Sequence, residues 1–281
     1  MIPMLIHVSV FLVLPILGSA IISVMDYNPL RDSNWFVGID NYIRLFSDEK
    51  FIISLKNTMV FTLFAVILDI LIPLTLATLI CQLKSNKTRS FFRMMFFLPC
   101  IAPLVASSVV WGRSIYPLKT GLLNLILKAL GLSRINWTGD ARYLMISVII
   151  FTIWADMGYN TILFSAGMDG IPEDLYEAAK LDGAGRWARF KEITLPLLAR
   201  TTTFVTLMTI ISMLQMFAQF NVLALKNGPQ NSGLVLTSYI YQTAFNQKEM
   251  GYAAAISVVL FLITFLISRI QQRAGKVDWE Y

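Results

Sequence analysis

Six apolar stretches, each long enough to cross a lipid bilayer, restrict what this chain can fold into. A membrane-spanning helix needs about 20 predominantly apolar residues, and its backbone polar groups must pair within the segment. The stretches cover residues 2–25, 58–81, 92–111, 143–168, 202–225 and 252–270. We therefore predict an all-α integral membrane protein with six transmembrane helices, formed as a single domain over residues 1–281.

The charge balance and the scarcity of metal-binding residues exclude several function classes. Only 14% of the residues are charged, and the net charge is +6. In a membrane protein, a positive excess is typical of cytoplasmic loops and contact with anionic lipid; no nucleic-acid-binding module is visible, so a nucleic acid partner is not expected. His7 is the sole histidine, and Cys81 and Cys100 lack metal-ligand spacing. We predict no metal site, no disulfide and no cofactor bound by this chain.

The connecting segments predict the orientation. A basic cluster over residues 84–93 favours a cytoplasmic loop there, which places both termini in the cytoplasm. Residues 121–132 are too few to cross and contain Lys128, so we expect a helix lying at the membrane interface. Prolines occur inside the apolar stretches, where we expect packing kinks more than gating hinges. They are Pro15, Pro73, Pro99 and Pro103.

A polar segment between the fourth and fifth stretches predicts a helix–turn–helix on the membrane surface. Pro172 is followed by Glu173 and Asp174, and proline and acidic residues favour the first turn of a helix. Gly183 is a natural left-handed stop. A second short helix, RWARFKEI, is expected to end at Pro196.

The residues of this segment leave two interpretations open. Ala178 and Ala179 have almost no side chain, so a partner could approach their backbone closely, and apolar anchors from Leu175, Trp187 and Phe190 would hold it. On this first interpretation, the segment is a docking surface for another protein. The alternative is an amphipathic surface element that only braces the helix bundle.

A family resemblance favours docking. The pattern resembles the signature loop of the inner-membrane permease subunits of binding-protein-dependent ABC importers. The fixed positions of that pattern are filled by Glu177, Ala178, Ala179, Gly183, Ile193, Leu195 and Pro196, with Asp182 and Trp187 in the fuller string. The stretches GIDNYIRLF, LKNTMVFTL, FFRMMFFLP, YEAAKLDGAGRW, NGP and MGYAAAISVVLF are similar, in order, to maltose-type and oligosaccharide permeases. The chain lacks their basic N-terminal tail and the large external domain of the maltose permease itself, so it resembles the smaller six-span members.

The resemblance implies the type I ABC importer permease fold, with a cytoplasmic coupling-helix loop over residues 169–200. It implies a bacterial or archaeal plasma membrane protein that works with a second, homologous permease subunit, two ATPase subunits and an extracytoplasmic sugar-binding protein. The sequence contains no nucleotide-binding G-x-x-x-x-G-K-[ST] motif. We therefore expect that this chain is not an enzyme and that ATP is bound by the partner subunits.

Polar residues inside two apolar stretches are candidates for contact with a transported molecule. Such residues are costly in lipid and usually face a cavity or another helix. The fourth stretch contains Thr152, Asp156 and Tyr159, with Asn160 alongside, and the fifth contains Ser212, Gln215 and Gln219. Their hydroxyl, amide and carboxylate groups beside an aromatic ring suit a neutral, hydroxyl-rich ligand. The resemblance implies a sugar held by these two helices; the alternative is hydrogen bonding between helices.

Other cargoes and mechanisms remain as alternatives. A polyol or a glycerol-phosphate-like compound could use the same fold, although a phosphate would require Arg or Lys beside these polar residues. An ion-coupled secondary transporter would need no docking loop and would use Asp69 or Asp156 for coupling. Asp69 has no polar neighbours along its stretch, so we expect it to contact another helix or a partner subunit. Gly251, Ala254 and Ala255 predict close helix approach in the sixth stretch.

Overall fold

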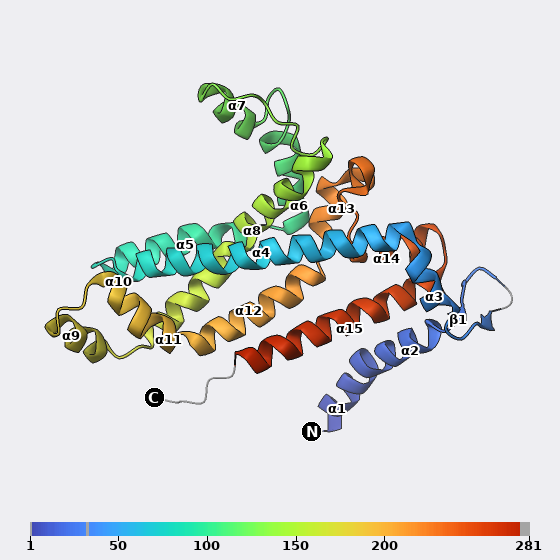
Figure 1. Cartoon of the computed structure of the whole chain (residues 1–281), viewed down its shortest axis with the longest axis horizontal. Helices are drawn as coiled ribbons and strands as arrows, with labels where there is room; N and C mark the ends of the chain where they lie inside the picture. Colours follow the sequence, from blue (N-terminus) through green and yellow to red (C-terminus); the bar gives the residue numbers. More distant parts are fainter. Residues whose placement is uncertain (1, 32–33, 276–281) are drawn as a thin grey trace.

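The computed structural model describes residues 2–31 and 34–275, which are predominantly helical (Figure 1). Four helical segments are long and apolar enough to cross a membrane, and two bent helix pairs raise the number to as many as six. The four unbroken segments are α1–η1–α2 (Ile2–Ile22), α4 (Glu49–Cys81), α8 (Ala141–Asp169) and α15 (Met250–Ala274). Each corresponds to a predicted stretch, because long apolar runs form helices in which every backbone group pairs internally.

The third predicted stretch is a broken span. Helix α5 (Asn86–Ile101) is followed by α6 (Leu104–Val110) and the π-helical turn η2 (Trp111–Ile115), with a bend of 91°. The break lies at Ala102, whose extended backbone is the conformation favoured before a proline. Of the four predicted kinks, this one at Pro103 is the sharpest described, whereas Pro73 and Pro99 lie inside continuous helices.

The fifth predicted stretch, residues 202–225, is wrong in its second half. Helix α12 (Ala199–Leu214) ends before Gln215, and α13 (Ala218–Leu223) starts a new direction. Met213, Met216 and Phe220, which lie on either side of this break, all belong to one hydrophobic core. Shorter elements continue the chain: η4 (Leu225–Asn227), η5 (Pro229–Asn231), α14 (Leu236–Tyr241) and η6 (Gln242–Asn246).

Close backbone contacts hold the long helices together. Helix α8 packs against α4 and α5, and a Cβ on Gly158 would lie 2.1 Å from the carbonyl oxygen of Phe96. Gly251 also permits a close approach, as predicted, but to the backbone of Met25 after the first span. Only glycine allows such contact, so these positions fix how the spans pack.

The end of the molecule opposite α9 (Glu173–Leu181) carries small elements and a partly buried polar cluster. The strands β1 (Met25–Asp26) and β2 (Trp35–Phe36) pair antiparallel. They precede α3 (Asp40–Ser47). Elsewhere, α7 (Leu122–Ala129) projects from the bundle, which confirms that a helix forms within residues 121–132 (Figure 1).

Asp48 is the centre of that polar cluster. It caps α4 through the amides of Lys50 and Phe51, and accepts hydrogen bonds from the hydroxyls of Tyr239 and Tyr252. Burial by itself would raise the pKa of the Asp48 carboxyl, but these hydrogen bonds outweigh it and hold the pKa below its ordinary value. The Arg44 guanidinium lies 4.0 Å from the centroid of the Tyr252 ring. This cluster ties α3, α4, α14 and α15 together.

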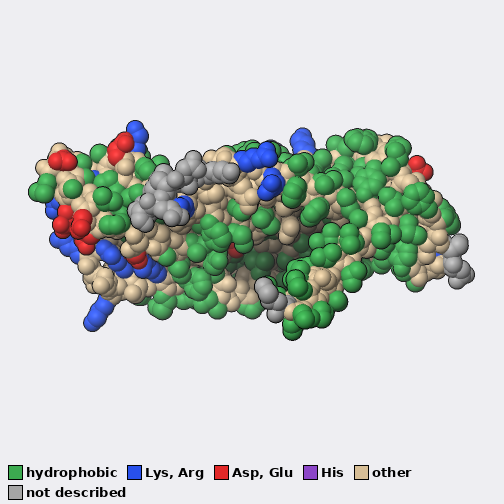
Figure 2. Space-filling model, turned by 90° about the horizontal axis from the view of Figure 1, so that it is seen from below, with side chains coloured by type: hydrophobic (Ala, Val, Ile, Leu, Met, Phe, Trp, Pro, Cys, Tyr) green, Lys and Arg blue, Asp and Glu red, His purple; other side chains and the backbone are tan. Residues whose placement is uncertain are grey.

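The placement of charge and of the chain ends agrees with a membrane-crossing bundle. The start of α1 and the end of α15 both point toward the end that carries α9, as an even number of crossings requires (Figure 1). Charged side chains gather at that same end, whereas the rest of this face is largely apolar and is hollowed near its centre (Figure 2).

Candidate functional site

Residues 169–200, the loop predicted to dock a partner and called the docking loop below, begin with a helix whose end is well defined. Helix α9 (Glu173–Leu181) follows Pro172 and has two acidic residues in its first turn. At its end, the amide of Gly183 bonds the carbonyl of Lys180 and the amide of Ala184 bonds that of Ala179. This is a Schellman motif, which requires a left-handed residue, and Gly183 has a φ of +81°. The predicted stop at Gly183 is confirmed.

The second half of the loop continues further than expected. Helix α10 (Arg186–Arg189) runs through the π-helical turn η3 (Phe190–Thr194) into α11 (Leu195–Leu197). The helical segment ends at Leu197, one residue after the predicted end at Pro196, which lies in the first turn of α11, where its missing amide is tolerated. The chain then bends by 67° between Leu197 and Ala199 as it enters α12.

The loop is packed firmly on the ends of the spans. Phe190, Ile193 and Leu197 pack on a buried cluster. The cluster consists of Leu74, Ala77, Phe164, Met168, Ile171, Leu198 and Val205. The hydroxyls of Tyr176 and Thr194 lie 2.9 Å apart and join the two halves of the loop. A displacement of the loop would therefore be transmitted to α4, α8 and α12.

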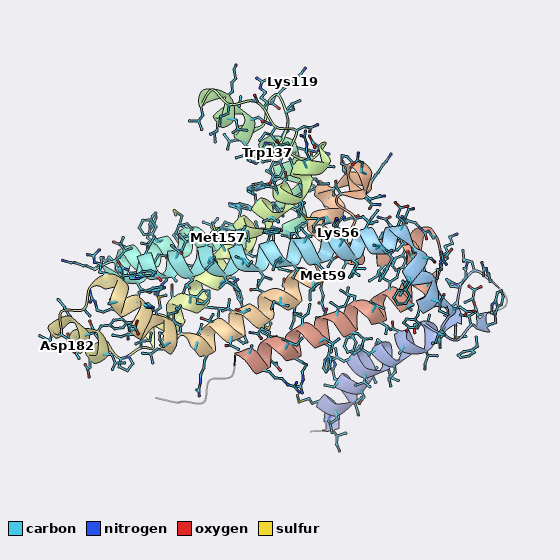
Figure 3. The ribbon with its side chains drawn as sticks, in the orientation of Figure 1. Lys56, Met59, Lys119, Trp137, Met157 and Asp182 are labelled. Carbon is cyan, nitrogen blue, oxygen red and sulfur yellow. The ribbon has the colours of Figure 1, made fainter. Side chains whose placement is uncertain are left out.

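Most of the residues predicted to dock are exposed on the outer side of this loop. The exposed members are Glu177, Ala178, Asp182, Gly183, Trp187, Leu195 and Pro196, whereas Ala179 and Ile193 are partly buried. The Trp187 side chain is 73% exposed and stacks on Phe190, with 5.6 Å between the ring centroids. Asp182 lies at the tip of the molecule (Figure 3).

The apolar anchors differ from the prediction. Phe190 packs inward on the bundle, so it serves the fold, while Leu175 and Trp187 remain exposed. Leu181, which is 89% exposed, was missed. Its spacing of three and four residues from Ala178 and Glu177 places it on their face of α9 and could have revealed it.

The polar residues of α8 divide between the interior and an accessible face. Thr152 is buried, and its hydroxyl donates to the Met216 sulfur at 3.6 Å. Tyr159 is 53% exposed. Asp156 is partly buried and has no hydrogen bond or ion pair to any described residue. A carboxylate within a span is costly without a partner, so Asp156 must face water, a ligand or another subunit.

Asn160 is used for helix packing, which corrects its assignment as a substrate contact. It is buried, and its amide donates to the Asp69 carboxylate at 2.8 Å and to the Thr209 hydroxyl at 3.3 Å. The interhelical alternative for Asp69 is therefore confirmed, and this polar contact links α4, α8 and α12. The other Asp69 oxygen has no partner among the described residues.

The polar residues of the fifth stretch do not form one face. Ser212 and Gln215 are exposed, but Gln219 is 3% exposed and lies in α13 after the break. The predicted spacing assumed a continuous helix, so it failed when the helix ended at Leu214. Asp156, Tyr159, Ser212 and Gln215 remain as accessible polar residues.

Comparisons with known proteins agree with this architecture. The arabinooligosaccharides transport system permease protein AraP of Bacillus subtilis (strain 168) is 35% identical over 268 residues, which cover 95% of this chain and 84% of AraP. The lactose transport system permease protein LacF of Rhizobium radiobacter is 34% identical over 278 residues, covering 98% of this chain and 92% of LacF.

A solved structure and a family model extend the comparison. A chain of a bacterial alginate ABC transporter, crystallised with an alginate pentasaccharide-bound periplasmic protein, has the same fold, with a TM-score of 0.86. It is 23% identical and matches 98% of this chain and 92% of its own. Residues 70–276 match the family model described as the binding-protein-dependent transport system inner membrane component. With its helical bundle and exposed loop, the chain belongs to this family of inner-membrane transport components.

Proposed function

We propose that this chain is a permease subunit of an ATP-driven importer that moves an oligosaccharide or related neutral sugar. A binding protein outside the membrane delivers the sugar, and this subunit works beside a second, homologous permease subunit. The family supports transport dependent on a binding protein. Relatives named for arabinooligosaccharides and lactose support a sugar cargo.

The single observation that carries the cargo class is Asp156, an unpartnered carboxylate within a span, with the exposed Tyr159 one turn away. A carboxylate accepts hydrogen bonds from sugar hydroxyls, and a tyrosine ring packs against the apolar face of a sugar. Ser212 and Gln215 add neutral polar groups. None of these four residues is cationic, which disfavours an acidic polysaccharide or a phosphorylated cargo.

The docking loop supports a division of labour between subunits. Two ATPase subunits at the cytoplasmic face bind and hydrolyse ATP, and each contacts one permease subunit through such a loop. Leu175, Leu181 and Trp187 are exposed on the loop, as an interface with a soluble partner requires. This arrangement places the loop and both termini in the cytoplasm of a bacterial or archaeal cell.

The packing of the loop suggests how ATP drives transport. Closure of the ATPase pair brings the two docking loops together. Because Phe190, Ile193 and Leu197 pack on α4, α8 and α12, the spans move with the loop. The pathway then opens outward to receive the sugar, and it opens inward again after hydrolysis.

A polyol is the second candidate cargo, since it offers the same hydroxyl groups, whereas a glycerol-phosphate-like compound lacks a cationic contact at these residues. An ion-coupled secondary transporter would need neither a binding protein nor the docking loop, and the family speaks against it.

The test of the cargo site is Asp156→Ala and Tyr159→Ala in the assembled importer. We expect Asp156→Ala to reduce sugar uptake about tenfold or more, because a hydrogen bond to a charged group contributes roughly 1.5–3 kcal/mol. Tyr159→Ala should also reduce uptake, because it removes both the ring contact and a hydroxyl group. Tyr159→Phe separates the contribution of the ring from that of the hydroxyl. The ATPase should still co-purify, since the docking loop lies at the far end of α8.

Ile146→Ala is the matched control, because Ile146 is an exposed side chain on the same helix. It should leave uptake at the normal rate. Normal uptake in both the Asp156 and Tyr159 variants would remove these residues from the sugar pathway. Loss of the ATPase from either variant would instead make this face a structural contact between subunits.

A further inference from the structure

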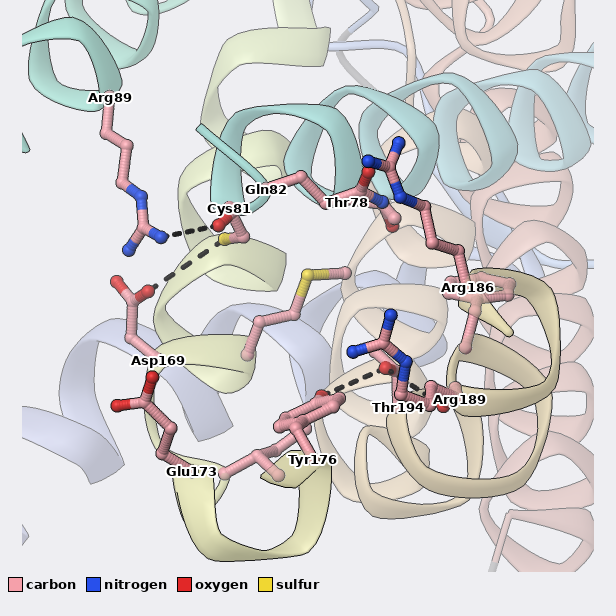
Figure 4. Close-up of a pocket in the computed structure, with 13 residues that line it drawn as sticks. Thr78, Cys81, Gln82, Arg89, Asp169, Glu173, Tyr176, Arg186, Arg189 and Thr194 are labelled. Atoms are coloured by element: carbon pink, nitrogen blue, oxygen red, sulfur yellow. Dashed lines mark hydrogen bonds between the residues drawn. The ribbon is translucent and has the colours of Figure 1, made fainter. Parts of the chain in front are cut away.

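A cavity of about 460 Å³ lies between the docking loop and the ends of α4 and α8 (Figure 4). Gln82 and Arg89 line it from the side of the spans, and Arg186 and Arg189 line it from the loop. Phe190, which packs inward, is the only residue considered above for docking that lines it, and no residue considered for sugar contact does. The cavity therefore requires an explanation of its own.

The lining of this cavity is positively charged overall. Arg89, Arg186 and Arg189 face it, together with the acidic residues Asp169 and Glu173. Asp169 is already neutralised by Arg93, with 2.8 Å between the charged groups. Figure 4 places Glu173 on the opposite side of the cavity from Arg186 and Arg189. One wall thus carries two arginines, and no acidic residue that lines the cavity lies beside them (Figure 4).

These two arginines lack any counter-charge among the described residues. Arg186 and Arg189 lie three residues apart on α10, so they share a face, where like charges destabilise a helix. Neither side chain has an ion pair or hydrogen bond to a described residue, and the Nε of Arg189 is buried without an acceptor. A buried donor without a partner is rare in folded proteins and indicates a missing acceptor.

We propose that this cavity binds a phosphate-bearing anion, held by Arg186, Arg189 and Gln82. Guanidinium groups match the geometry of phosphate oxygens, and the Gln82 amide is exposed at the end of α4. The volume lies in the range of small-molecule sites. Basic pockets at the cytoplasmic ends of spans suit acidic lipid headgroups, so the source is an anionic phospholipid or a soluble phosphate ester. This cytoplasmic placement rests on the proposed function.

Such an anion would contact both the docking loop and the spans. Arg186 and Arg189 belong to the loop, whereas Gln82 follows α4. The occupant joins the two parts that must move together when the ATPase closes. The site therefore adjusts how tightly ATPase closure is transmitted to the membrane helices.

The experiment uses the full chain, purified with the subunits that co-purify with it, in nanodiscs of phosphatidylcholine with or without phosphatidylglycerol. Retained lipid is measured by native mass spectrometry. We expect Arg186→Gln/Arg189→Gln to reduce retention of phosphatidylglycerol about tenfold, given the strength of hydrogen bonds between charged groups. Arg134→Gln/Arg142→Gln is the matched control, because it removes the same charge near the start of α8, far from the cavity.

A second arm separates the two sources of phosphate. In phosphatidylcholine alone, inorganic phosphate or glycerol 3-phosphate is titrated, and the thermal unfolding temperature is recorded. Stabilisation that requires Arg186 and Arg189 identifies a soluble phosphate ester. Retention of phosphatidylglycerol without such stabilisation identifies the lipid headgroup.

A single substitution at an exposed position tests the site even if the arginine double variant is unstable. Gln82→Glu places a carboxylate at an exposed position beside the cavity and should also weaken binding. Equal binding by wild type, Gln82→Glu and the arginine double variant would overturn the proposal. Because binding is measured without sugar transport, loss of this site and failure of the proposed function give different results.

Discussion

Gly183 offers the sharpest test of the docking loop, because the structure separates its backbone role from its surface role. Its φ is +81°, and a Cβ built there would meet no atom within 4 Å. The Cβ of Gly183→Trp would therefore clash with nothing in the described chain. The left-handed backbone costs about 1–2 kcal/mol for a residue with a side chain, which is small against the 5–15 kcal/mol of a typical folded protein. The chain should remain folded in the membrane.

Gly131 provides the matched control. It has a φ of +74°, open space around its Cβ, and the same Schellman hydrogen bonds, from Gly131 to Lys128 and from Leu132 to Leu127. It follows α7, which projects from the bundle away from α9 (Figure 1). Gly131→Trp therefore carries the same backbone strain without touching the docking loop.

We expect the two variants to lose similar stability and to differ in function. Gly183→Trp should abolish sugar uptake and reduce co-purification of the ATPase, because an indole on the loop blocks a close-fitting groove. A loss of only 1.4 kcal/mol in docking free energy lowers the affinity about tenfold. Uptake by reconstituted vesicles and thermal unfolding measure the two effects. If Gly183→Trp transports as well as Gly131→Trp, the docking role is wrong.

Three further predictions concern the buried contact between Asn160 and Asp69, the polar cluster around Asp48 and the energy source. Asn160→Ala should destabilise the chain by roughly 1.5–3 kcal/mol, because it removes a buried hydrogen bond to the Asp69 carboxylate. Asp69→Asn in the same chain should recover part of that loss in a double-mutant cycle, and additive effects would contradict the contact. Asp48→Asn keeps a helix cap but removes the carboxylate whose folded pKa these hydrogen bonds lower, so wild type should be more stable at neutral pH. That advantage should shrink as the pH falls below the usual aspartate value of 3.8 and through the lower folded pKa; a constant difference in unfolding temperature would refute it. Purified alone, the chain should neither bind nor hydrolyse ATP, and specific binding of labelled nucleotide would contradict the proposed division of labour.

The local signals in the sequence predicted most of the helices and the form of the docking loop. The apolar stretches indicate the spans because a bilayer requires about 20 apolar residues per crossing, whatever their order. Pro172 and Gly183 predict the start and stop of α9 because both act on their own backbone dihedrals. These features depend on neighbours in the chain, so they can be recognised without knowledge of the tertiary structure.

Tertiary packing decided which polar residues remain accessible. Asn160 and Tyr159 are adjacent in the sequence, yet Asn160 is buried against Asp69 while Tyr159 is half exposed. Helix α12 ends at Leu214, and Met213, Met216 and Phe220 on either side of that end pack into a core formed with other helices. Arg186 and Arg189 likewise face a cavity that exists only where the loop meets α4 and α8. The sequence by itself determined where most helices form, because that depends on local dihedrals and lipid solvation. The faces that these helices bury depend on contacts between residues far apart in the chain.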